Sequence, residues 1–203
     1  MGIRQLSLIE TPPKDRYPIQ TYVIEENDIV IKEAIYREIS RNGQVFYLHN
    51  RIGDLDYLYR KLRRLVPEAR VGIAHGKMTK IQLENTIQSF IDREFDVLLC
   101  TTIIETGIDI PNTNTLIIDG AEYLGLSQIY QIRGRVGRAD RVAYAYLMYG
   151  KNKVLSDEAA KRLSAIKEFT NLGSGYRIAV RDLAIRGAGD ILGKEQSGYI
   201  DAV

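Results

Sequence analysis

The sequence predicts an α/β fold in which helices cover both faces of a parallel sheet. Short, mostly apolar runs alternate with segments of helical periodicity from residue 19 to residue 149. This alternation is typical of a parallel sheet, because its crossover helices bury both faces of the strands. After Gly150 two helical stretches follow with no strand between them. We therefore expect an α/β domain over residues 1–152 and a helical hairpin with an extended loop over residues 153–203.

Composition excludes several other classes. The chain has 203 residues, of which 45% are hydrophobic and 27% charged, so disordered, collagen-like and coiled-coil proteins are excluded. No apolar run approaches the roughly 20 residues that span a bilayer, and no signal-peptide pattern is present, so we expect a soluble protein that is not exported and has no membrane partner. The single cysteine, Cys100, excludes an internal disulfide and is typical of a reducing cytosol. A net charge of +2 means that any nucleic-acid contact must come from locally placed basic residues.

Strands are expected at five short apolar runs, and one further segment is a candidate. The runs are residues 45–48, 71–74, 97–100, 115–118 and 143–149, and the candidate is 20–24. Their near-continuous apolar character is typical of strands buried on both faces.

Helices are expected between these strands, where apolar residues recur every three or four positions. The first covers 28–40, and the second extends to residue 65 from Asp54, its candidate N-cap. The third runs from about 80 to 93, because residues 79–82 form a capping-box pattern. In the second domain, Ser156 is expected to cap one helix of the hairpin, and residues 176–185 form the other.

The common catalytic patterns of α/β proteins are missing from the sequence. There is no G-x-x-x-x-G-K-[ST] loop, and no G-x-G-x-x-G follows a strand, so the chain lacks the usual means of holding a nucleotide by itself. No nucleophile elbow accompanies His49 and His75, which excludes a Ser/His/Asp hydrolase. Two isolated histidines also do not make a metal site, so none is expected.

Three arginines occur within the six residues 133–138, separated by glycines. Guanidinium groups suit phosphate oxygens, and glycines let the backbone approach a ligand closely. A solvated basic turn is the competing interpretation of so short a motif. The segment 100–111 favours phosphate binding, because it directly follows a buried strand, and ligands of open α/β sheets lie at the carboxyl ends of strands.

Together the two segments resemble motifs V and VI of superfamily two helicases. Residues 106–109 have the T-G-x-D form, and residues 131–138 have the Q-x-x-G-R-x-G-R form. DEAD-box RNA helicases carry His-Arg where this chain has Gln131-Ile132, so RNA unwinding is disfavoured. The resemblance implies the second of two RecA-like domains that enclose ATP, lacking the P-loop. The first domain would hold most of the ATP and the Mg²⁺, and no metal would bind here.

The same resemblance assigns roles in the ATP cleft. Arg135 and Arg138 would be catalytic arginine fingers that stabilise charge developing on the γ-phosphate. Gly107 and Asp109 would line the cleft, and Gln131 would couple the nucleotide state to domain closure.

A second group of residues would contact DNA. Asn50 and Arg51 end a segment that resembles motif IV, although a solvated loop is an equally good interpretation of either residue alone. His75 lies in the next loop, which faces the DNA in this group of proteins. Thr101 and Thr102 offer hydroxyl groups to phosphate, contacts that carry no sequence information.

The segment 169–198 resembles the translocation motif shared by RecG-type branched-DNA helicases and bacterial transcription-repair coupling factors. Residues 9–13 and 100–111 have the coupling-factor form. By position, Arg162, Arg186 and Gln196 match the functional residues of the motif, which converts cleft closure into a push on duplex DNA.

The resemblance therefore implies the second motor domain of an ATP-dependent double-stranded DNA translocase. Its partners would be DNA and the first RecA-like domain, with RNA polymerase and excision-repair proteins contacted through other domains of a cytoplasmic, nucleoid-associated bacterial protein. The chain alone would not hydrolyse ATP. Two alternatives remain open: a RecG-type motor domain, and a nucleic-acid-binding module with no role in catalysis.

Overall fold

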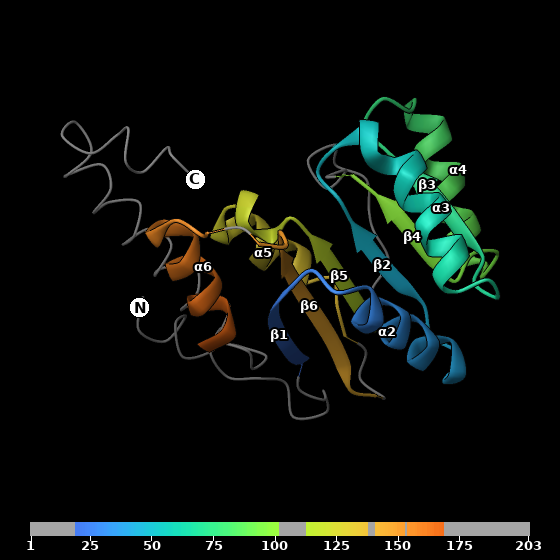
Figure 1. The fold of residues 1–203 in the computed structure, drawn as a ribbon. Helices are drawn as coiled ribbons and strands as arrows, with labels where there is room; N and C mark the ends of the chain where they lie inside the picture. The colour runs from blue at the N-terminus through green and yellow to red at the C-terminus, as the bar shows by residue number, and fades with distance from the viewer. Residues whose placement is uncertain (1–18, 102–112, 138–140, 153, 169–203) are drawn as a thin grey trace, which may run out of the picture.

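The α/β class is confirmed by a six-stranded sheet in which every pair of neighbouring strands is parallel. The computed structural model describes residues 19–101, 113–137, 141–152 and 154–168 (Figure 1). The strand order is β1-β6-β5-β2-β4-β3. The strands are β1 (Ile19–Glu25), β2 (Val45–Leu48), β3 (Val71–Ala74), β4 (Val97–Cys100), β5 (Thr115–Asp119) and β6 (Ala143–Tyr149).

Helices cover both faces of the sheet, as predicted. α2 (Asp28–Ser40) and α3 (Leu55–Leu65) pack on one face, and α4 (Lys80–Ile91), α5 (Leu126–Arg133) and α6 (Asp157–Glu168) on the other. Two 3-10 turns, η1 (Ile52–Asp54) and η3 (Ala121–Tyr123), follow β2 and β5. Figure 1 shows α6 beside the β1 edge, and α6 also contacts η3.

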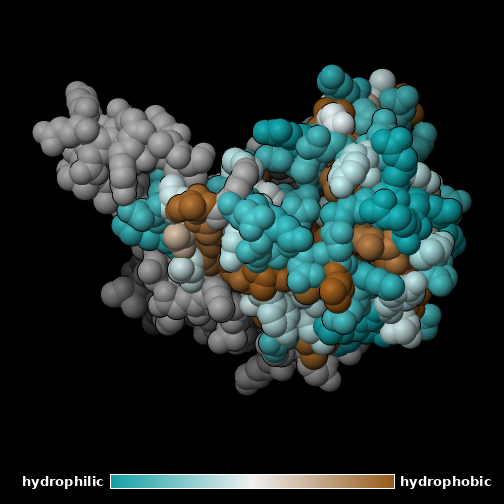
Figure 2. Space-filling model, in the orientation of Figure 1, coloured by the Kyte–Doolittle hydropathy of each residue, from teal (hydrophilic) through white to brown (hydrophobic). Residues whose placement is uncertain are grey.

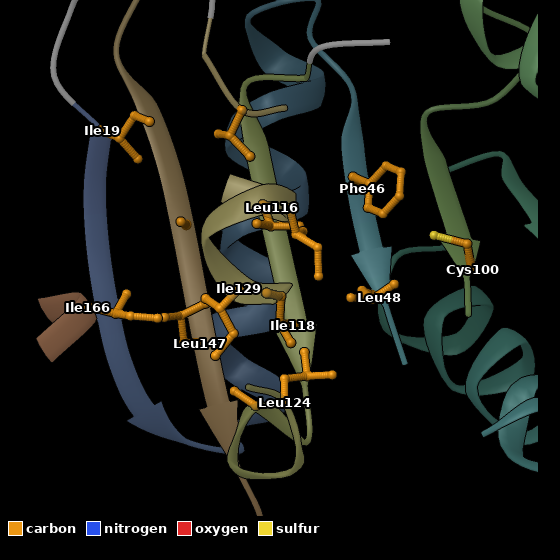
Figure 3. Close-up of a cluster of buried hydrophobic side chains, with 14 of the residues drawn as sticks. Ile19, Phe46, Leu48, Cys100, Leu116, Ile118, Leu124, Ile129, Leu147 and Ile166 are labelled. Carbon is orange, nitrogen blue, oxygen red and sulfur yellow. The ribbon is translucent and has the colours of Figure 1, made fainter. Parts of the chain in front are cut away.

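Alternating side chains along each strand divide the core into two layers. In β2, Val45 and Tyr47 pack with α2 and α3, whereas Phe46 and Leu48 pack with the helices of the opposite face. Figure 3 shows the second layer, where Ile129 of α5 and Ile166 of α6 approach Leu147 of β6. The near-continuous apolar runs of the sequence follow from this burial on both faces.

Most of the expected helix ends are confirmed, but one expected capping bond does not form. The Thr79 hydroxyl and the Gln82 side chain form the predicted capping box of α4, and Ser156 Oγ accepts from the Ala159 amide at the start of α6. Asp54 is at the predicted N-cap position of α3, but its side chain accepts no hydrogen bond from the helix amides. The residue ends a 3-10 turn, and its carboxylate bonds to His49 instead. α4 ends at Ile91, two residues early, because Arg93 adopts a positive φ of 62°.

The connections of the sheet change direction between β2 and β5. After β2 the chain continues through α3 to β3 and β4 on one side, and after β5 it continues through α5 to β6 on the other. Such a switch point leaves a crevice at the carboxyl ends of the two strands, where ligands of open α/β sheets bind.

The described residues stop within the expected hairpin. They include α6, whereas the expected helix 176–185 and the extended loop lie outside them, so the domain boundary after residue 152 stays a prediction. None of the helices in the described ranges has the length and apolar character needed to cross a lipid bilayer.

Candidate functional site

A cavity of about 460 Å³ lies at the switch point, above the carboxyl ends of the central strands. Its walls come from the ends of β1, β2, β5 and β6, from the two 3-10 turns and from α3. The lining residues are Glu26, His49, Asn50, Arg51, Asp54, Tyr57, Leu58, Asp119, Gly120, Glu122, Tyr123, Gly150 and Lys151. On the face seen in Figure 2, hydrophilic residues predominate and hydrophobic ones form separate patches. A polar cavity at this position is suited to a charged ligand or partner.

His49 is held between two carboxylates in this cavity. Its Nδ1 lies 3.1 Å from Oδ2 of Asp119 at the end of β5, and its Nε2 lies 2.9 Å from Oδ2 of Asp54. Burial alone would lower the pKa of His49, but the hydrogen bonds and charges of Asp119 and Asp54 outweigh burial and raise this pKa above its ordinary value. A protonated imidazole donates from both nitrogens and therefore satisfies both carboxylates. His49 thus ties the end of β2 to the end of β5.

Two of the expected DNA-binding residues, Asn50 and Arg51, directly follow this histidine. Both side chains are exposed and line the cavity. Their backbone begins at His49, whose amide also donates to the Cys100 carbonyl at 2.9 Å. We call the bonds of His49 to Asp54 and Asp119 the His49 clamp. Together with the backbone bond to Cys100, this clamp fixes where the side chains of Asn50 and Arg51 leave the sheet.

The other described DNA-binding candidates, His75 and Thr101, form a second group at the ends of β3 and β4. The Thr101 hydroxyl accepts from the Gly76 amide at 3.1 Å, and its own amide donates to the Ala74 carbonyl at 3.1 Å. Thr101 is buried, so its hydroxyl positions the loop that begins at His75. His75 is half-buried, and its Nδ1 accepts from the Lys77 amide at 3.2 Å.

The arginine-rich segment lies at the opposite edge of the sheet. Helix α5 runs from the carboxyl end of β5 back to its amino end, so the segment follows at the start of β5 and β6. Gln131 is exposed and Arg135 is half-buried. Arg133 is buried, and the burial lowers the pKa of its guanidinium. The idea that all three arginines serve phosphate binding is therefore wrong for Arg133, which is part of the interior.

Backbone hydrogen bonds join this segment to the residues after motif V. The Thr113 amide donates to the Arg135 carbonyl at 3.1 Å, and the Gly137 amide donates to the Thr113 carbonyl at 2.7 Å. Gly137 has a φ of 108°, a conformation that a side chain would strain. The backbone on both sides of Arg135 is thus fixed against the start of β5.

Arg162 connects α6 to the rest of the domain. Its guanidinium donates to Glu158 Oε1 in the same helix and to the backbone carbonyl of Glu122 in η3, each at 3.1 Å. Only 15% of its side chain is exposed, so Arg162 does not lie on a solvated helix face. Both of these hydrogen bonds are to residues of α6 and η3.

Six of the expected site residues lie outside the described residues. They are Thr102, Gly107, Asp109, Arg138, Arg186 and Gln196. Among the residues that the structure describes, no group of three or more His, Cys, Asp or Glu side chains is arranged to hold a metal ion.

Asp119 and Glu122 belong to the site although no motif of the sequence predicts them, and His49 is not isolated as expected. Asp119 and Glu122 are buried, in contrast to most carboxylates of a soluble protein. The sequence does contain a signal for His49 and Asp119, because each directly follows an apolar run that predicts a strand. Ligands of open α/β sheets bind at these carboxyl ends of strands.

Known proteins share both the sequence and the fold of this chain. The helicase conserved C-terminal domain family matches residues 26–140. Transcription-repair-coupling factors of Staphylococcus haemolyticus and Staphylococcus aureus are 59% and 58% identical over all 203 residues, and the chain spans 17% of their length. A structure of RecG bound to a three-way DNA junction is 32% identical, with a TM-score of 0.71 over 88% of this chain and 24% of that one.

A more distant structure shows the same fold. Domain 2 of the DEAD-box helicase Mss116p, bound to an RNA duplex, is 18% identical with a TM-score of 0.55, covering 75% of this chain and 59% of that one. The parallel sheet and the family match over residues 26–140 lead to one conclusion. The chain belongs to the family of helicase C-terminal domains.

Proposed function

We propose that the chain is the second motor domain of an ATP-dependent double-stranded DNA translocase of the transcription-repair-coupling type. The observation that carries the proposal is the pair of backbone bonds between Thr113 and the residues Arg135 and Gly137. They join Thr113, which lies between motif V and β5, to the arginine segment of motif VI. A displacement of either segment is therefore transmitted to the other.

The amino edge of the sheet would face ATP. Arg135 and Arg138 would bring guanidinium groups to the γ-phosphate, with Gly107, Asp109 and Gln131 lining the same cleft. Arg135 suits this role, because its backbone is fixed on both sides and a guanidinium pairs well with phosphate oxygens. The bound nucleotide supplies the phosphoryl group, and the first motor domain would hold most of the ATP and Mg²⁺.

The carboxyl edge would face DNA. Asn50 and Arg51, together with His75 and Thr102, would contact backbone phosphates, which gives movement without sequence preference. The buried Thr101 would position the His75 loop for this contact. ATP and DNA would then act on opposite edges of one parallel sheet. Because the packed sheet moves as a body, a shift of the arginine segment would displace the DNA-contacting edge.

The translocation motif would receive the same movement through a short chain of contacts. Arg135 follows α5, α5 follows η3, and Arg162 bonds to η3 through the Glu122 carbonyl. Arg162, Arg186 and Gln196 would turn this movement into a push on duplex DNA. Displacement of RNA polymerase and recruitment of excision-repair proteins, in the bacterial cytoplasm at the nucleoid, would use other domains of the complete protein.

Substitution of Arg162 tests this path in the complete protein. Arg162→Ala should preserve much of the ATPase activity and lose displacement of a third strand from duplex DNA. Lys161→Ala, an exposed neighbour on α6, is the matched control and should keep both activities. Strand displacement at the wild-type level in Arg162→Ala would contradict the assignment.

The chain by itself should show no ATPase above background, because it has no P-loop. Its DNA binding should be weak and should fall steeply with added salt, as expected for phosphate contacts. DNA-stimulated turnover by the purified chain would refute the half-site arrangement.

A RecG-type branched-DNA helicase is the second candidate, favoured by the fold shared with RecG over most of this chain. The two are separated by assaying the complete protein on a three-way junction and on a stalled transcription complex. Release of RNA polymerase with little junction unwinding supports the coupling type, and the reverse supports the RecG type.

A further inference from the structure

Glu122 has a buried carboxylate oxygen with no donor in the described part of the chain. Only 3% of the residue is exposed. Its Oε2 accepts from the Gly150 amide at 2.7 Å, whereas its Oε1 has no hydrogen-bond partner. An unpaired buried carboxylate oxygen is costly, so the orphan atom indicates a donor supplied from elsewhere. Glu122 also lines the switch-point cavity, so a small shift of its side chain would present this oxygen to a donor in the cavity.

Gly120 leaves space beside that oxygen. The residue has a φ of 72° and lines the same cavity. A carbon at the position of its missing Cβ would lie 3.9 Å from Glu122 Oε1, 3.7 Å from Asn50 Oδ1 and 3.4 Å from a ring carbon of Tyr123. Two acceptor oxygens and an aromatic ring therefore lie close together beside Gly120, which has no side chain of its own. A planar group with several N–H donors is complementary to this arrangement.

The charges around the cavity favour a cation. Carboxylates outnumber the cationic side chains that line it: Glu26, Asp54, Asp119 and Glu122, against Arg51 and Lys151, with His49 shared between two of them. Glu26 is also paired with Lys61 at 3.3 Å, so Glu122 is the carboxylate left without a cation. Within the described ranges, no group of three or more His, Cys, Asp or Glu side chains is arranged to hold a metal ion.

We propose that this cavity binds the side chain of an arginine from outside this chain, with its guanidinium between Glu122 Oε1 and Asn50 Oδ1 beside the Tyr123 ring. A guanidinium has five N–H donors in one plane and stacks on aromatic rings, whereas an ammonium is a compact point charge. The arginine would belong to another part of the complete protein or to a separate protein. The proposal does not require ATP turnover, and it shares only Asn50 with the DNA contacts of the proposed function, so the arginine and a DNA phosphate would compete for this residue.

Titration with N-acetyl-arginine amide tests the site. We expect saturable changes in the amide resonances of Gly120, Tyr123 and Gly150 in the 203-residue chain, with a dissociation constant on the order of 1 mM, as the size of this probe allows. N-acetyl-citrulline amide, its neutral analogue, should bind at least about tenfold more weakly, since charge-assisted bonds are roughly twice as strong.

Two variants separate this site from other anionic surfaces. Glu122→Gln keeps an acceptor for the Gly150 amide and should weaken binding of N-acetyl-arginine amide at least about tenfold. Glu33→Gln, on an exposed position of α2, is the matched control and should not change it. Asn50→Asp, at an exposed position that does not disturb the fold, should tighten binding several-fold.

The proposal fails if the probe does not bind saturably, if citrulline binds equally well, or if Glu122→Gln or Asn50→Asp leaves affinity unchanged. Equilibrium dialysis of the radiolabelled probe against the complete protein then identifies the source. Loss of the Glu122-dependent binding in the complete protein shows that its own arginine fills the site. Equal binding by the chain and the complete protein shows that a separate protein supplies it.

Discussion

Replacement of His49 by alanine tests how the carboxyl edge of the sheet is held together. The variant removes two hydrogen bonds to carboxylates whose side chains differ in exposure: Asp119 is 10% exposed and Asp54 is 48% exposed. The buried bond to Asp119 contributes about 1.5–3 kcal/mol, because a charged group is left unpaired in the interior. The exposed bond to Asp54 adds about 0–1 kcal/mol. We expect a total loss of about 1.5–4 kcal/mol, or roughly 3–16 °C in the melting temperature.

The loss should depend on pH with a defined sign. Because its bonds to Asp119 and Asp54 overcome the effect of burial and raise the pKa of His49, the stabilisation is complete below the unfolded-state pKa of about 6.5. It diminishes as the pH rises through the higher folded-state pKa, since a neutral imidazole donates from only one nitrogen. His49→Ala should therefore destabilise the chain more at pH 6 than at pH 9.

Urea unfolding at the two pH values measures this effect. A double-mutant cycle of His49→Ala with Asp119→Asn isolates the interaction between the two residues. His75→Ala is the matched control and should cost less than about 1 kcal/mol, since it loses one bond from a backbone amide in an exposed loop. If His49→Ala lowers the free energy of unfolding by less than about 0.5 kcal/mol, or by the same amount at both pH values, the His49 clamp does not hold this edge of the sheet together.

Two further substitutions test local features of the fold. Gly43→Ala should destabilise the chain by about 2–4 kcal/mol, because its Cβ would lie 1.9 Å from the buried Glu38 carboxylate, which Arg41 and Thr115 already hold. Gly53→Ala is the control and should cost far less, because a Cβ at Gly53 would meet no atom within 4 Å. Equal melting temperatures for the two variants would exclude the clash. Thr101→Val removes the acceptor of the Gly76 amide and should lower the free energy of unfolding by about 0.5–1.5 kcal/mol. It should also weaken DNA binding by the complete protein, and unchanged DNA affinity would show that the His75 loop does not need this bond.

Local rules were sufficient for the strands and for most helix ends. Strands with the expected bounds occur at residues 45–48, 71–74, 97–100 and 143–149. They were predictable because an apolar run of four to eight residues is typical of a strand buried on both faces. The capping box at Thr79 was also predicted, since both of its partners lie within one turn. Asp54 is at the predicted N-cap position but makes no capping bond, because its carboxylate bonds to His49, five residues earlier, instead of to the helix amides.

The site was less predictable from the sequence, because its contacts join distant segments. His49 and Asp119 are 70 residues apart, and no local pattern connects them. The arginine segment was found by its motif, but its place at the amino edge follows from the direction of α5, a helix that was not predicted over its full length. The burial of Arg133 could not be predicted either, because Arg133 and Arg135 belong to the same short segment of arginines and glycines.

The most direct test of the proposed function is Arg138→Ala in the complete protein, with ATPase activity and DNA affinity measured on the same preparation. Removal of an arginine finger should lower the rate of ATP hydrolysis by about 10³ to 10⁵. The dissociation constant for duplex DNA should change by less than about twofold, because the arginine segment and the DNA-contacting residues are assigned to opposite edges of the sheet. Weakened DNA binding with ATP turnover preserved would contradict the account and identify the domain as a nucleic-acid-binding module.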